Sequence, residues 1–135
     1  GYKSILVGKI PSARATCEIQ MNNGSKNTPI SLAYINLGSL KNKNLCKQFF
    51  RETLNKFFQR FPTANEYNSF KINSGGEDQS RCRALNCYNS VLKEFGYNHT
   101  MDYDGIINHE YATKLTPNDD DGSCEAGFRY WIRDT

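Results

Sequence analysis

Long apolar runs are missing from this chain. No stretch approaches the ~18 consecutive apolar residues that suggest a membrane-spanning helix, so we expect no membrane span. Cys-x-x-Cys pairs, glycine-rich phosphate-binding loops and the Gly-x-Ser-x-Gly sequence of α/β-hydrolases are also absent. These absences remove the usual zinc-site, nucleotide-site and serine-hydrolase patterns, and we expect no cofactor.

The chain is instead rich in aromatic residues and of a size suited to one domain. Its 135 residues include eight Phe, eight Tyr and one Trp. A chain of this length can close a hydrophobic core of its own. We therefore expect a single domain over residues 1–135, with a core that is largely aromatic.

The net charge of +3 conceals an uneven distribution. Residues 1–72 contain eleven Lys or Arg and three Asp or Glu, a balance of +8, whereas residues 73–135 contain six and eleven, a balance of −5. Such a polar chain can present one half to an anionic partner. The expected arrangement is the commoner one, in which the two halves complement each other within one fold.

Five cysteines are many for a chain without a metal motif: Cys17, Cys46, Cys82, Cys87 and Cys124. Disulfides persist in oxidising compartments, so the count favours a secreted or periplasmic protein with two bridges and one unpaired thiol. Our preferred pairing joins Cys82 or Cys87 to Cys124, among fifteen connectivities that stay open, since any one of five is left out and four pair in three ways. Asn23 and Asn98 begin glycan-acceptor triplets, which agrees with secretion. Reduced buried thiols in a cytosolic protein are the alternative.

Residues Asn44–Phe61 have the periodicity of an amphipathic helix. Their apolar positions recur at steps of four, four, three and four and share one face: Cys46, Phe50, Leu54, Phe57 and Phe61. Pro62 ends this helix, and Asn42 or Asn44 is expected to cap its start. A second helix is predicted over about 80–95, where Gly96 follows as a helix-ending glycine.

Alternation of apolar and polar residues predicts strands on both sides of the helices. Residues 4–10 are predicted as a short buried strand that ends at Pro11. The other strands cover 16–21 and 30–37 before the first helix, and 97–103, 107–115 and 128–132 after the second. The second and third strands form a hairpin, and residues 63–80 are expected to be irregular, anchored by Tyr67, Phe70 and Ile72. The order is roughly βββ-αα-βββ, which predicts an α+β fold: an antiparallel sheet packed against two helices and stabilised by disulfides.

His99 and His109 are the only histidines, and together they suit acid–base cleavage of RNA. A two-residue turn at Asp104–Gly105 places the rings on opposite faces of the hairpin, whereas a three-residue loop places them on one face. Two ordinary half-buried histidines are the preferred interpretation. Cys17 as a thiol nucleophile is disfavoured, because neither a helix start nor a glycine-rich turn adjoins it.

Two charged clusters suggest other ligands. Asp119 and Asp121 lie in an acidic loop that departs from the EF-hand pattern at both ends, so a solvated loop is preferred over a calcium site. Lys43, Lys47 and Arg51 form a basic stripe on the first helix. Such a stripe can contact phosphates. Because the domain as a whole is barely basic and such lysines normally cover the edge of an apolar face, nucleic acid is disfavoured as a partner.

The final strand supplies the predicted binding residues. Arg129, Trp131 and Arg133 alternate with the apolar residues of the strand, so we expect them to face outward. Trp and Arg are enriched in the hot spots of protein interfaces. The hypothesis is that these three side chains line a binding face.

We therefore predict a non-enzymatic, secreted or periplasmic recognition domain that binds a protein or another extracellular macromolecule. Inhibitor, immunity-type and adhesin-type roles all fit this prediction. A small secreted, ribonuclease-like hydrolase that uses His99 and His109 is one alternative. A structural subunit of a surface assembly, held together by an edge strand, is the other.

Overall fold

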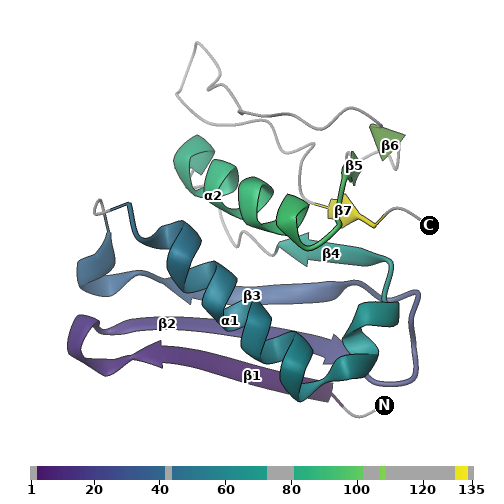
Figure 1. The fold of residues 1–135 in the computed structure, drawn as a ribbon, viewed down its shortest axis with the longest axis horizontal. Coiled ribbons are helices and arrows are strands. Elements are labelled where there is room, and N and C mark those ends of the chain that lie inside the picture. Colours follow the sequence, from purple (N-terminus) through teal and green to yellow (C-terminus); the bar gives the residue numbers. More distant parts are fainter. Residues whose placement is uncertain (1–2, 42–43, 73–80, 102–106, 109–129, 134–135) are drawn as a thin grey trace.

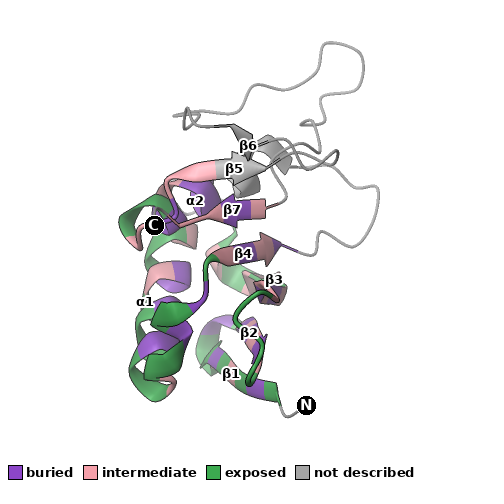
Figure 2. Cartoon of the chain, turned by 90° about the vertical axis from the view of Figure 1, so that its right-hand side faces the viewer, coloured by how far each residue is buried: buried purple, intermediate pink, exposed green. Residues whose placement is uncertain are grey.

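The computed structural model describes residues 3–41, 44–72, 81–101, 107–108 and 130–133. In this part of the chain seven strands form one sheet, and two α-helices lie on the same face of it (Figures 1 and 2). The helices are α1 (Cys46–Arg60) and α2 (Arg81–Glu94). The strands are β1 (Lys3–Ile10), β2 (Ala15–Asn22), β3 (Ile30–Asn36), β4 (Ser69–Ile72), β5 (His99–Met101), β6 (Ile107–Asn108) and β7 (Tyr130–Ile132).

The strands are ordered β1-β2-β3-β4-β7-β5-β6 across the sheet. Neighbours are antiparallel except β3 and β4, which run parallel. A parallel pair needs a long crossover connection, and α1 lies in that connection. β7 follows β5 and β6 in sequence but is inserted between β4 and β5 (Figure 1).

The predicted α+β class is confirmed, with one change in the order of elements. The first three strands, their hairpin and both helices are where the alternation and the helical period predict them. Residues 63–80, however, were expected to be irregular, and they contain a short 3-10 helix (Pro62–Glu66) and β4. The predicted anchors Tyr67, Phe70 and Ile72 are buried. The order is therefore βββ-α-β-α-βββ.

The C-terminal end of α1 agrees with the prediction, and its N-terminal end does not. The helix stops at Arg60, before Pro62, as expected. At its start the capping position is Leu45, and no side chain caps the helix. The predicted cap by Asn44 is therefore wrong: this residue has φ +57°, outside the extended conformation of a capping residue. Asn42 lies outside the described residues, as does the segment that precedes α2.

Phe50 joins three elements of the core. Its side chain on α1 is fully buried, and its ring meets the edge of Phe70 on β4 at 6.2 Å and of Tyr88 on α2 at 5.3 Å between centroids. Leu54 and Phe57, on the same predicted face, are also fully buried. The aromatic core expected from the composition is thus centred on α1.

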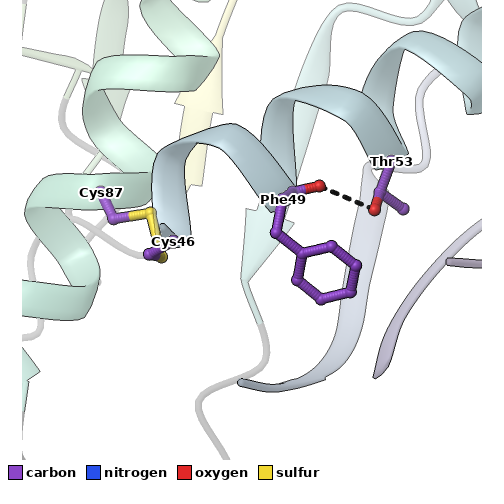
Figure 3. Close-up of a disulfide and its surroundings, with 4 residues drawn as sticks. All are labelled: Cys46, Phe49, Thr53 and Cys87. Carbon is purple, nitrogen blue, oxygen red and sulfur yellow. Dashed lines mark hydrogen bonds between the residues drawn. A yellow bond between two sulfur atoms is a disulfide. The ribbon is translucent and has the colours of Figure 1, made fainter. Parts of the chain in front are cut away.

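Helix α1 approaches the sheet closely at Gly8 of β1. A Cβ atom at this position would lie 2.5 Å from the Oγ1 of Thr53, closer than side-chain atoms approach one another. Thr53 is buried and donates its hydroxyl to the carbonyl oxygen of Phe49 at 2.9 Å (Figure 3). Glycine at position 8 therefore lets the helix lie directly on the strand.

A disulfide between Cys46 and Cys87 ties the start of α1 to the middle of α2 (Figure 3). Of the two predicted partners of Cys124, Cys87 is excluded because it is already paired, and the pairing of Cys82 with Cys124 stays a prediction. Cys124 and the side chain of Cys82 lie outside the described residues. The bridge spans 41 residues, and closing a loop of that length stabilises a fold by roughly 4 kcal/mol in the chain-entropy model.

Replacing Gly8 with alanine tests the close approach. We expect Gly8→Ala to lower the free energy of unfolding by about 1–3 kcal/mol, because the new methyl group overpacks against Thr53. Adding Thr53→Ala to Gly8→Ala removes the obstructing hydroxyl and methyl groups, so the double variant should lose less stability than the sum of the two single variants. Chemical denaturation of all four proteins measures this coupling, and strictly additive losses would contradict the proposed contact.

Candidate functional site

The predicted outward face of the final strand is reversed in the structure. Trp131 has no exposed surface, and its indole Nε1–H donates to the Oδ1 of Asn89 on α2 at 2.9 Å. Its neighbours Tyr130 and Ile132 are half-buried. The expectation that Trp131 faces outward on a binding surface is therefore wrong, because its ring fills the space between β7 and α2. Arg129 lies outside the described residues.

Arg133 is held among aromatic rings. Its guanidinium lies over the Tyr97 ring at 4.5 Å and near the Phe58 ring at 5.9 Å, and its Nη2 donates to the Tyr97 hydroxyl at 3.0 Å. Burial raises the pKa of that hydroxyl, and the hydrogen bond from Arg133 opposes the rise. Arg133 is half-buried, so much of this residue serves the packing of the described core.

The exposed apolar surface lies elsewhere, on the side of the sheet that carries no helix in the described residues (Figure 2). The large hydrophobic side chains exposed in the described part of the chain are Ile5, Val7 and Tyr34, at 47%, 38% and 46% exposure. Val7 pairs with Glu18, and Glu18 pairs with Tyr34, so Val7, Glu18 and Tyr34 lie in one row across β1, β2 and β3. Ile5 lies beside this row, two residues before Val7 on the same face of β1. We call this helix-free side of β1–β3 the open face.

A β-bulge places Tyr34 on the open face. Glu18 pairs with Tyr34 but the next residue, Ile19, pairs with Leu32, which leaves Ala33 as the extra residue in β3. Without the bulge, with Ala33 paired opposite Glu18, regular alternation from buried Leu32 would turn Tyr34 inward. Bulges re-aim side chains in this way and are frequent beside functional sites.

The sequence of β1 contains a signal for the open face, the alternation of small residues with larger apolar ones. Residues 4–10 were predicted as a buried strand, yet only every second side chain of β1 faces the helix. The small residues Ser4 and Gly8 are buried, while Ile5 and Val7 between them are exposed. Small residues at alternate positions mark the face that a helix approaches closely, which leaves the larger apolar residues on the outside.

Only one member of the predicted histidine pair lies among the described residues. His99 on β5 is half-buried and pairs with Ile132 of β7, whereas His109 lies outside the described part of the chain. The predicted two-residue turn would pair Met101 with Asn108, and the predicted three-residue loop would pair it with His109. In the structure Met101 pairs with Ile107, so neither register is present. The ribonuclease-like alternative stays a prediction.

Cys17 is a buried, unpaired thiol. Burial raises its pKa from 9.0 to about 12, and a hydrogen bond with the Thr53 side chain lowers it only in part. A thiol of this kind is protonated at neutral pH and shielded from substrates, so the structure argues against Cys17 as a nucleophile.

Neither the candidate calcium site nor the candidate phosphate-binding stripe gains support from the described residues. Asp119 and Asp121 lie outside the described residues, and within the described ones no cluster of three or more His, Cys, Asp or Glu side chains is arranged to hold a metal ion. In the basic stripe, Arg51 donates to both carboxylate oxygens of Glu94 at 2.8–3.2 Å. This pairing on α1 and α2 removes one of the free cations that phosphate binding would need.

Comparison of the chain with protein-family models, with curated proteins and with solved structures finds no match. None of the described helices is long and apolar enough to cross a membrane.

The burial of Trp131 gives a prediction that separates a core residue from a binding residue. We expect Trp131→Ala to lower the free energy of unfolding by about 3–5 kcal/mol, since it leaves a large cavity and removes the hydrogen bond from the indole to Asn89. Tyr130→Ala, at the half-buried neighbouring position, is the matched control and should cost less. Equal losses in thermal or chemical denaturation would contradict the assignment of Trp131 to the core.

The raised pKa of Cys17 predicts a loss of stability in alkali. The unfolded chain releases the thiol proton near pH 9.0, whereas the folded chain holds it until about pH 12. The stabilising contribution is thus complete below pH 9.0 and is lost as the pH rises toward about 12. From about pH 8 to about pH 10, the free energy of unfolding should fall by about 1 kcal/mol more in the wild type than in Cys17→Ala. Parallel pH profiles of the two proteins would show that Cys17 titrates normally in the folded state.

Proposed function

We propose that this protein is a non-enzymatic recognition domain of an oxidising compartment, secreted or periplasmic, and that it binds another protein through the open face. The observation that carries the proposal is the row formed by Val7 and Tyr34, with Ile5 beside it. Adjacent strands lie about 4.8 Å apart, so Val7 and Tyr34 are about 10 Å apart across the row. Inhibitor, immunity-type and adhesin-type roles are all compatible with such a surface.

The chemistry of the open face suits protein recognition. Glu18 lies between Val7 and Tyr34, and Gln20 pairs with Ile5, so apolar groups alternate with hydrogen-bonding groups. Protein interfaces combine an apolar centre with a polar surround, and tyrosine is enriched among their strongest contacts. The bulge at Ala33 supports the same assignment, because it exposes an aromatic ring that regular alternation would turn inward.

The compartment is inferred from the disulfide. Cys46 and Cys87 are bonded, and bridges of this kind are rare in the reducing cytosol. The predicted acceptor position Asn23 is exposed in the turn after β2. Both features fit export, and neither requires an enzymatic activity.

Site-specific photo-crosslinking tests the proposal. A crosslinking amino acid at position 34 should capture a discrete protein from the extracellular or periplasmic fraction of the native source. The matched control is position 56, where Lys56 is exposed on the helical side. Once the partner is purified, Tyr34→Ser should weaken binding at least about tenfold, or about 1.4 kcal/mol, in calorimetry, and Lys56→Ala should not. Affinity unaffected by Tyr34→Ser, or capture only at position 56, would refute the open face as the binding surface.

A further inference from the structure

β1 forms an edge of the described sheet. All eight of its residues pair with β2 in one uninterrupted register, and no strand among the described residues pairs with its other side (Figure 1). The outer side therefore carries a row of backbone N–H and C=O groups that no described strand satisfies. These groups are a template for one more strand.

The middle of β1 lacks the features that usually protect an edge. Natural edges are interrupted by proline or a bulge, kept very short, or charged along their length. β1 is eight residues long, contains no proline before Pro11 and has no irregularity in its pairing. Its charges, Lys3 and Lys9, are restricted to the two ends. The centre of this edge is thus open to pairing.

The side chains of β1 on the open face form a symmetric pattern. Lys3, Ile5, Val7 and Lys9 alternate with the helix-facing residues, and all four are exposed. Neither lysine has a carboxylate partner among the described residues. Lys3 and Lys9 lie six positions apart, so their Cα atoms are about 20 Å apart along the strand. A neighbouring strand would therefore meet a cation, two apolar groups and a second cation.

The helix-facing side offers a place for one further side chain. Beyond Lys9, a notch of about 90 Å³ lies between the end of β1 and the start of α1. It is lined by Ile10, Leu40, Leu45, Gln48, Phe49 and Glu52. Most of these residues are apolar, and the volume of the notch is suited to one aliphatic side chain.

We propose that β1 pairs edge to edge with an extended segment of the partner protein, whose open-face residues read acid, apolar, apolar, acid. The inference rests on the proposed function and deepens it by naming the mode of binding, β-strand addition. Backbone hydrogen bonds to β1 supply affinity. The two acidic residues opposite Lys3 and Lys9 supply register and selectivity.

The charge pattern argues for a different protein over a second copy of this chain. If two β1 strands pair antiparallel about their centres, Lys3 of each faces Lys9 of the other. If they pair parallel and in register, each lysine faces its own equivalent. Like charges directly opposite each other destabilise a strand pair, so these two dimers, the ones that pair β1 over its full length, are disfavoured. An acidic partner segment removes the repulsion and gains two attractive pairs.

A designed peptide is the probe for this mode. The acetylated and amidated octapeptide Leu-Glu-Thr-Val-Thr-Val-Thr-Glu, paired antiparallel, places its glutamates opposite Lys9 and Lys3, its valines opposite Val7 and Ile5, and its leucine at the notch. We expect it to bind the full chain, to slow hydrogen exchange selectively at β1 amides, and to bind at least about tenfold more tightly than the same peptide with lysine in place of glutamate. A peptide of the same sequence with N-methyl groups on both its valines and its threonines should not bind, because the N–H groups that face β1 are then lost whichever alternate set forms the ladder.

Charge reversal of the protein completes the test. Lys3→Glu/Lys9→Glu changes only exposed side chains and should keep the melting temperature while reversing the preference between the two peptides. Equal affinity for both peptides, binding of the N-methylated peptide, or exchange protection away from β1 would overturn the inference. Concentration-dependent dimers of the unmodified chain with protected β1 amides would replace the partner segment with a second copy. A partner captured at position 34 whose affinity survives the charge reversal would overturn edge pairing and leave the proposed function intact.

Discussion

The contact between α1 and the sheet is the interaction on which the rest of the structure depends. Phe50, Leu54 and Phe57 are fully buried in it, and burying each such side chain stabilises the fold by roughly 2 kcal/mol. They reach the sheet because Gly8 allows Thr53 to approach β1. The other elements are attached to α1: β4 through the ring of Phe70, and α2 through Tyr88 and the Cys46–Cys87 disulfide.

Ion pairs on the surface contribute little to stability by comparison with this core contact. The Arg51–Glu94 pair joins the basic and acidic halves of the sequence, but its side chains are 39% and 47% exposed, and such pairs contribute about 0–1 kcal/mol.

This arrangement makes the sheet one-sided. Both helices lie on the same face, so the helix-facing side of β1–β3 is filled by small and apolar residues while the other side carries the open face (Figure 2). Stacking α1 so tightly on β1 requires glycine inward at position 8, and inward Ser4 is small as well, so Ile5 and Val7 are the large side chains of the strand on the outside. The packing that stabilises the fold and the surface proposed for binding therefore have the same origin.

Much of the fold follows from periodicity in the sequence, and the failures have identifiable causes. Helix α1 and β2 extend over enough residues for the helical period or the alternation to be unambiguous, whereas β1 and β3 could be placed along the chain but not assigned their outward faces. β4 was missed because it has only four residues and two inward apolar positions. The face of β7 was assigned wrongly because large apolar residues occupy both sets of alternating positions, and choosing between them requires knowledge of α2, whose Asn89 accepts the indole hydrogen of Trp131. The Cys46–Cys87 bridge depends on how two helices meet, which spacing along the chain does not specify.

The bulge at Ala33 is the feature that periodicity alone conceals, and it bears most directly on the surface proposed for binding. A regular β3 would turn Tyr34 toward the interior opposite Cys17; with the bulge, Ile35 takes that place and the tyrosine ring is 46% exposed. Stability alone does not account for this choice, because a bulge interrupts the ladder and an exposed ring forgoes part of its burial energy. The same extra residue aligns Tyr34 with Val7 across Glu18, on the side of the sheet where the lysines of β1 also lie. A surface role explains both the interruption and the alignment, since a strand added at β1 would extend this row and meet the lysines at its ends.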